Sequence, residues 1–171
     1  MSRVEYDAVA PTFDNRYAGQ NYDQTTDAVR RFIGTVSRRS VLEVGCGTGH
    51  WLDVIRGDAA LLVGVDRSLG MLRRAQKPAS PALLVQGTAE LLPLRAQLFD
   101  RVLCVNALHH FPDPEGFVAE CRRVLRPGGS FLTIGLDPHN GRDHGGCTTI
   151  SPRRGRRTSD ATSRPSAFAP C

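Results

Sequence analysis

VLEVGCGTGHW, residues 41–51, places a short apolar run directly before three glycines at alternate positions, Gly45, Gly47 and Gly49. The run is strand-sized and rich in β-branched residues, which predicts a buried strand. Glycine permits a sharp turn and lets a ligand approach the backbone where a Cβ atom would clash. The residues from 50 onward have apolar positions at helical spacing. The stretch therefore predicts a strand, a glycine loop and a helix, an arrangement typical of nucleotide sites.

Apolar strand-like runs alternate with amphipathic segments along most of the chain. The pattern predicts strands over 41–45, 61–66, 82–87, 99–108 and 130–136, and helices over 24–36, 50–57, 69–76 and 114–125. Ser68 is placed to cap the helix that follows it. Such alternation favours an α/β fold, a doubly wound parallel sheet covered on both faces. Ligands of these sheets bind beyond the carboxyl ends of the strands.

Composition favours one cytoplasmic domain. The chain has 171 residues, 40% of them hydrophobic, with no apolar run long enough to span a membrane and no secretory signal at its N-terminus. The five cysteines have no metal-ligand spacing, so we expect reduced, buried thiols and no metal site. The net charge of +5 comes mostly from residues 141–171, which hold six arginines and two aspartates. The rest is nearly neutral, which argues against a nucleic-acid partner.

Residues 141–171 differ in character from the domain that we assign to residues 1–140. Arginine, serine, threonine, proline, glycine and alanine dominate them, so we expect a disordered tail. Lys77 is the only lysine, which suggests a GC-rich gene. A GC-rich gene read out of frame yields a composition like that of the tail. Our hypothesis is that the residues after about 143 are a frameshift product or an equivalent replacement.

Asp66, at the end of the second predicted strand, is a candidate for contact with a ribose. A carboxylate there can accept hydrogen bonds from both ribose hydroxyls, although it could instead cap the next helix. This residue does not separate a methyl donor from NAD, because both carry a ribose. The glycine spacing is G-x-G-x-G, with His50 where a dinucleotide fingerprint would carry its third glycine.

Five segments occur in a familiar order: VLEVGCGTG, GVDRSLGML, GTAELLPL, FDRVLCVNALHHFPDP and RVLRPGGSFLTIG. Together they resemble the successive motifs of class I S-adenosylmethionine-dependent methyltransferases, in the small-molecule branch that includes quinone-biosynthesis C-methyltransferases. The resemblance covers roughly residues 5–140. It implies a Rossmann-like methyltransferase fold, but the last two strands of that fold have no counterpart here. An unprotected apolar edge on strand 130–136 would then favour self-association.

The resemblance assigns donor contacts near the opening stretch. Gly45, Gly47 and Gly49 would pass under the methionine part of S-adenosylmethionine. Glu43 would orient its ammonium group; the alternative is a buried carboxylate bound by loop amides. Asp66 would bind the ribose.

Other positions would contact the adenine and the reacting end. Arg67 would stack on the adenine, or else remain solvated. Ala89 would donate its backbone N–H to the adenine. Thr88 is a departure, because the family often has Asp there to accept from the adenine amino group. Asn106 would line the end where the methyl group is transferred.

His109 is the candidate catalytic residue, and it follows Asn106 closely. Methyl transfer needs a base only where the acceptor must lose a proton, and an imidazole titrates near neutrality. Adjacent histidines should not face the cavity equally, so His110 is the weaker candidate; the alternative is that both form a packing turn. Aromatic residues near the N-terminus would cover the donor or attach the first helix: Tyr6, Phe13, Tyr17 and Tyr22.

We compare three functions with the sequence. The first is a methyltransferase that transfers the methyl group in line to a small molecule. The second, a nicotinamide-dependent oxidoreductase, fits neither the glycine spacing nor any recognisable hydride site. The third is a non-catalytic fragment that binds S-adenosylmethionine, which the sequence does not separate from the first.

Overall fold

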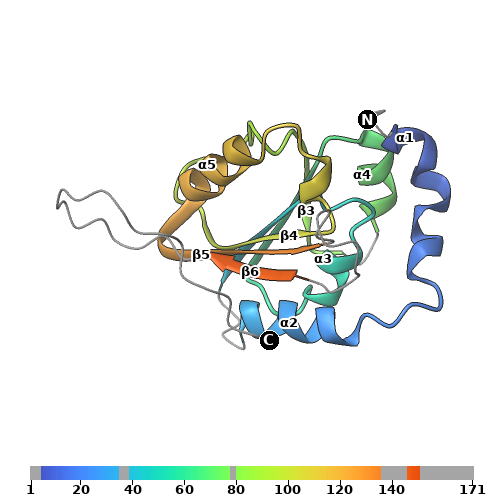
Figure 1. Ribbon diagram of the computed structural model, residues 1–171, viewed down its shortest axis with the longest axis horizontal. Coiled ribbons are helices and arrows are strands. Elements are labelled where there is room, and N and C mark those ends of the chain that lie inside the picture. Colours follow the sequence, from blue (N-terminus) through green and yellow to red (C-terminus); the bar gives the residue numbers. More distant parts are fainter. Residues whose placement is uncertain (1–4, 35–38, 78–79, 136–145, 151–171) are drawn as a thin grey trace.

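A twisted six-stranded sheet organises the protein (Figure 1). The computed structural model describes residues 5–34, 39–77, 80–135 and 146–150, the last range in backbone only. The strand order is β3-β2-β1-β4-β5-β6. The strands are β1 (Ser40–Val44), β2 (Leu61–Asp66), β3 (Leu83–Gln86), β4 (Phe99–Val105), β5 (Leu125–Gly135) and β6 (Gly146–Ile150). Neighbouring pairs from β3 to β5 are parallel, which confirms the predicted doubly wound sheet.

Local residue chemistry sets the helix ends. The helices are α1 (Tyr6–Val9), η1 (Ala10–Tyr17), α2 (Asp23–Ile33), α3 (His50–Val54), α4 (Leu69–Ala75), η2 (Leu108–His110) and α5 (Pro114–Val124). Ser68 caps α4 as predicted, since its Oγ accepts from the Met71 N–H at 3.1 Å. Helix α2 ends earlier than predicted because Gly34 follows it at a φ of 73°, which stops a right-handed helix.

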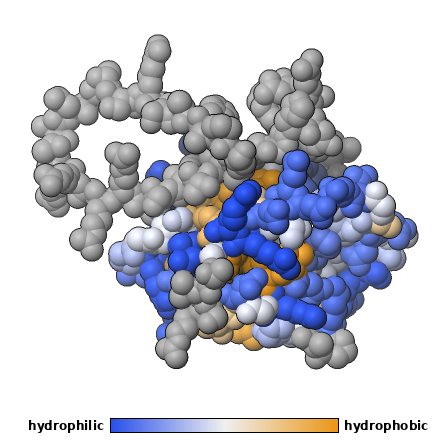
Figure 2. Space-filling model, turned by 90° about the horizontal axis from the view of Figure 1, so that it is seen from below, coloured by the Kyte–Doolittle hydropathy of each residue, from blue (hydrophilic) through white to orange (hydrophobic). Residues whose placement is uncertain are grey.

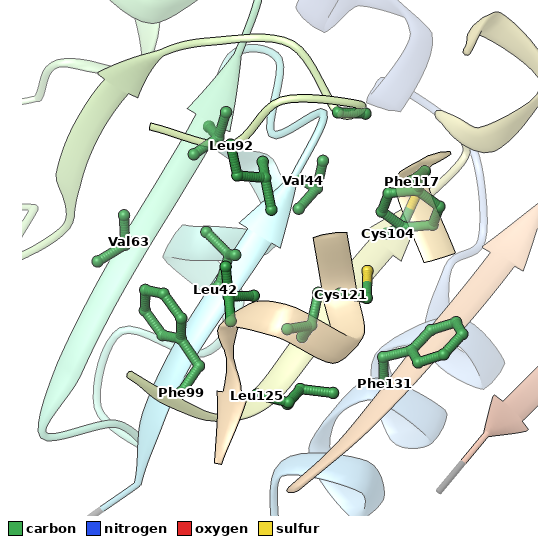
Figure 3. Close-up of a cluster of buried hydrophobic side chains, with 14 of the residues drawn as sticks. Leu42, Val44, Val63, Leu92, Phe99, Cys104, Phe117, Cys121, Leu125 and Phe131 are labelled. Atoms are coloured by element: carbon green, nitrogen blue, oxygen red, sulfur yellow. The ribbon is translucent and has the colours of Figure 1, made fainter. Parts of the chain in front are cut away.

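Both faces of the sheet are buried, which explains the continuous apolar runs of its strands. On one face, α5 packs Phe117 and Cys121 against Phe99 and Phe131 (Figure 3). On the other, helices α2 and α3 pack against the same strands. Burial raises the pKa of Cys104 to about 12, so this thiol is a core residue rather than a nucleophile.

Strand β6 contradicts the prediction of an exposed apolar edge. It pairs antiparallel with β5, from Phe131 opposite Ile150 to Gly135 opposite Gly146, so that edge is covered. The prediction averaged composition over residues 141–171 and overlooked three consecutive β-branched residues, Thr148, Thr149 and Ile150, a strand-forming run. Of the two strands expected to be missing, one is therefore present in the described chain, and self-association through β5 loses its basis. Residues 141–145 and 151–171 of the predicted disordered tail lie outside the described residues.

The described surface is mainly hydrophilic on the face that Figure 2 shows, with hydrophobic residues gathered near its centre. Within the described ranges, every helix is too short or too polar to cross a bilayer.

Candidate functional site

A cavity of about 1240 Å³ lies at the carboxyl ends of the central strands, where the fold predicts a ligand. Its walls come from the N-terminal segment, the ends of β1 and β2, residues 87–90 and residues 105–112. The cavity brings together nearly all the predicted site residues: Glu43, Gly45, Gly47, Asp66, Arg67, Thr88, Ala89, Asn106 and His109. Gly49 is the exception, because it does not line the cavity.

The three loop glycines have positive φ angles but different neighbours. A Cβ atom on Gly45 (φ 74°) would lie 2.4 Å from the Ala107 Cβ, so the approach of the segment after β4 requires glycine there. On Gly47 (φ 52°) it would lie 3.6 Å from a Phe13 ring atom, at ordinary contact distance. On Gly49 (φ 80°) it would lie 3.1 Å from Ala75. Gly49 therefore packs the loop against α4, and its predicted contact with a ligand stays a prediction.

Glu43 is fully buried at the end of β1, and neither of its carboxylate oxygens has a hydrogen-bond partner among the described residues. The backbone amide of Leu52 favours the charged form of the Glu43 carboxyl, but it makes no hydrogen bond with either carboxylate oxygen. Burial raises the pKa of Glu43 well above its ordinary value, and the Asp66 carboxylate raises it further. The alternative of a carboxylate bound by loop amides is thus wrong. An unpaired carboxylate of this kind is suited to a cationic ligand group.

Asp66 joins the glycine loop to the turn after β2. Its Oδ2 accepts from the Gly47 N–H at 2.8 Å, and its Oδ1 accepts from the Ser68 N–H at 2.9 Å. Burial raises its pKa, although these amide contacts oppose the rise. Each oxygen keeps a lone pair, so the carboxylate can still accept from a ligand.

Residues 87–90 form the wall beside β3. Arg67 also lines the cavity, and its guanidinium lies 5.8 Å from the centre of the Tyr6 ring. Thr88 is exposed, Ala89 is buried, and both line the cavity. Sequence reasoning missed Glu90, whose Oε1 is buried without a hydrogen-bond partner in the described chain. The run GTAELLPL offered no signal that separates this carboxylate from a solvated one.

Two aspartates that sequence reasoning did not single out fasten the N-terminal segment, one to the start of α4 and one to the glycine loop. Asp7 Oδ1 accepts from the Ser68 Oγ at 2.6 Å and the Gly70 N–H at 2.7 Å. These two bonds hold the pKa of Asp7 below its ordinary value. Asp14 accepts from the Thr48 hydroxyl and pairs with Arg74 at 3.5 Å. The partners are distant in sequence, so no local pattern identifies them.

Aromatic side chains of this segment attach it to α3 and also line the cavity. Tyr6, Phe13, Tyr17 and Tyr22 all line the cavity. The Tyr17 ring also stacks on His50, with centroids 3.8 Å apart and planes within 6°. Tyr22 meets the edge of Trp51 at 5.8 Å, which attaches the segment to α3.

The segment after β4 supplies another wall, and residues of α2 and the end of β5 also line the cavity. Asn106 has a φ of 54°, unusual for a residue other than glycine, and its N–H donates to the Ile134 carbonyl at 2.7 Å. The His109 and His110 rings lie 3.8 Å apart, and both line the cavity. Both side chains reach the cavity from the short η2 turn, and the expectation that they do not face it equally stays a prediction. Burial lowers the pKa of both imidazoles, and the Arg16 charge lowers it further.

Comparisons with known proteins agree with this geometry. A family described as "Methyltransferase domain" matches residues 42–133. The ubiquinone biosynthesis O-methyltransferase of Coxiella burnetii is 33% identical over 58% of this chain, which spans only 45% of that relative. This relative from ubiquinone biosynthesis is an O-methyltransferase. The sequence motifs had instead resembled the branch that includes quinone-biosynthesis C-methyltransferases.

Two solved structures share the fold. The YcgJ protein of Bacillus subtilis has a TM-score of 0.62 at 30% identity, over 66% of this chain and 50% of that one. DhpI in its complex with SAM and HEP has a TM-score of 0.65 at 26% identity, over 79% of this chain and 64% of that one.

Proposed function

This chain belongs to the methyltransferase family that matches residues 42–133, and from that premise we propose that it binds S-adenosylmethionine and methylates a small molecule. The observation that carries the proposal is the buried, unpartnered Glu43 carboxylate beside the glycine loop. The DhpI complex, which contains SAM, and the ubiquinone relative support the choice of ligand.

Glu43 fits the amino-acid end of the donor. The ammonium group of S-adenosylmethionine would supply the charge and the hydrogen-bond donors that this carboxylate lacks. Gly47 leaves the loop backbone open toward the cavity, because a Cβ there would meet only a ring atom of Phe13. A larger side chain at Gly47 would occupy the space that the methionine part needs.

Asp66 and residues 87–90 fit the nucleoside end. The remaining lone pairs of Asp66 would accept from the two ribose hydroxyls, while its contacts with Gly47 and Ser68 hold it in place. Arg67, Thr88 and the Ala89 backbone would contact the adenine. Asn106 would lie at the reacting end, where the segment after β4 closes the cavity.

S-Adenosylmethionine supplies a methyl group on a sulfonium, which an acceptor atom takes by in-line displacement while the C–S electron pair stays on sulfur. The donor is already activated, so most of the rate comes from proximity and alignment. The protein contributes a rigid donor cradle at the ends of β1 and β2. It also contributes an aromatic cover that excludes water.

The proposal includes a cytoplasmic location. Cys46, Cys104 and Cys121 are free and buried, as in a protein kept reduced.

Calorimetry with S-adenosylmethionine, S-adenosylhomocysteine and NAD tests the proposal. We expect the first two to bind and NAD to fail. Asp66→Ala should weaken binding of both by about 1–3 kcal/mol, because the ribose hydroxyls lose an acceptor. Gly47→Val should abolish it. Tight NAD binding without a response to the methyl donor would overturn the proposal.

A further inference from the structure

Two imidazoles and one cationic side chain line the same cavity. The His109 and His110 rings are 3.8 Å apart at the end of the β4 segment. Arg16 reaches the same cavity from η1, with its guanidinium 4.4 Å above the Phe13 ring. Its charge acts on both imidazoles.

Arg16 has no carboxylate partner in the part of the chain that the structure describes. The ion pairs found there join Arg74 to Asp14, Lys77 to Asp53, Arg123 to Glu120 and Arg126 to Asp100. A cation held against a ring and facing a cavity is suited to an anion that enters the cavity.

From this arrangement, and resting on the proposed methyl transfer, we infer that the acceptor is a planar molecule with an acidic hydroxyl, a phenol or enol, that Arg16 holds its oxyanion and that His109 takes its proton. The oxygen then keeps the electron pair with which it bonds the methyl carbon. The proton ends on the imidazole, so charge and atoms balance. The Phe13 ring, over which the Arg16 guanidinium lies, offers a flat apolar wall for such a molecule.

Other acceptor classes fit these groups less well. A neutral amine attacks without losing its proton first and becomes cationic on methylation, which Arg16 would oppose. A neutral hydroxyl is a poor nucleophile, and a cation beside it favours its ionised form. The cluster therefore matches an acceptor oxygen better than an acceptor nitrogen.

His109 is the better placed of the two imidazoles. The His110 ring meets the Tyr6 ring at 5.2 Å, and the Arg67 charge also acts on it, so it belongs to the donor side. For His109 the ring contact found is with His110. Burial lowers the pKa of both imidazoles, so each is neutral near neutral pH and has a free lone pair. In the inferred complex, the oxyanion beside His109 would stabilise its protonated form.

The test uses para-nitrophenol, whose absorbance distinguishes phenol from phenolate, on the chain without donor. We expect the bound probe to be more ionised than the free probe at the same pH. Arg16→Gln should weaken phenolate binding about tenfold or more, as for a lost charge-assisted hydrogen bond. Arg31→Gln, which removes another cavity arginine, is the matched control and should leave the probe ionised. Para-nitroanisole, which has no ionisable proton, should bind equally to the chain and to Arg16→Gln.

Calorimetry in two buffers of different ionisation enthalpy tests His109. In the unmodified chain the probe's proton should stay on the protein, whereas His109→Gln should release it to the buffer. His110→Gln should behave like the unmodified chain. An unionised bound probe, or proton release that does not depend on His109, would overturn the inference. Failure of S-adenosylhomocysteine to bind, measured separately, would overturn the proposed function instead.

Discussion

The proposed donor half and the proposed acceptor half of the cavity are built in different ways. The donor half consists of the loop after β1 and the turn after β2, tied together by Asp66 through backbone amides of Gly47 and Ser68. The acceptor half is assembled from side chains of separate segments, Arg16 from η1 and His109 from η2. A backbone cradle is fixed by the fold, whereas a side-chain cluster can change with few substitutions. One scaffold can therefore keep one donor while it serves different acceptors.

Replacement of the loop glycines should break the donor half with the largest effect. Gly45→Ala should lower the free energy of unfolding by about 2–4 kcal/mol, because a left-handed residue would also clash with Ala107. Gly47→Ala is the matched control and should cost only about 1–2 kcal/mol, since its Cβ meets an ordinary contact. Urea denaturation measures both. Equal losses would mean that the approach of Ala107 does not constrain the loop.

Glu43→Gln should separate stability from binding. Removal of a buried, unpaired carboxylate should raise the free energy of unfolding by about 1–3 kcal/mol at neutral pH. The same substitution should weaken S-adenosylhomocysteine binding. Denaturation and calorimetry on one preparation measure both effects. A loss of stability would show that Glu43 is a structural partner in the free protein.

The pH dependence of Glu43 follows from its raised pKa. The folded protein favours the protonated carboxyl more than the unfolded chain does. Its contribution to stability therefore increases as pH falls from the folded pKa toward the ordinary carboxyl value, and it is unfavourable above the folded pKa. The difference in stability between Glu43→Gln and the unmodified chain should shrink over that window.

Asp7→Asn should have the smallest effect, confined to the N-terminal segment. It weakens the contacts with Ser68 and Gly70, so amides of α1 and η1 and the Gly70 amide should exchange hydrogen faster, while the other amides of α4 change little. Because the folded pKa of Asp7 is lowered, these contacts persist above the ordinary carboxyl pKa and are lost as pH falls through the folded value. Glu5→Gln is the control. Exchange that accelerates across the whole chain would show that the segment supports the fold itself.

The sequence predicted more of the donor half than of the acceptor half, and the reason is physical. Strand periodicity, the glycine loop and the Ser68 cap are local signals, and the structure reproduces them. The contacts of Asp7 with Ser68 and of Asp14 with Thr48 join residues far apart in sequence, so no local pattern contains them. For the same reason, no local pattern places Arg16 and the two imidazoles in one cavity. Strand β6 was missed for another reason, because its strand-forming run is short and lies within a polar, proline-rich stretch.

The central claim is that the Glu43 carboxylate binds the ammonium group of the donor, and a thermodynamic cycle tests it most directly. Calorimetry would compare S-adenosylhomocysteine with its analogue that lacks the α-amino group, on the unmodified chain and on Glu43→Gln. We predict that loss of the amino group weakens binding strongly in the unmodified chain and little in Glu43→Gln, so that the two changes are coupled. Additive losses, with the amino group equally important in both proteins, would contradict the claim.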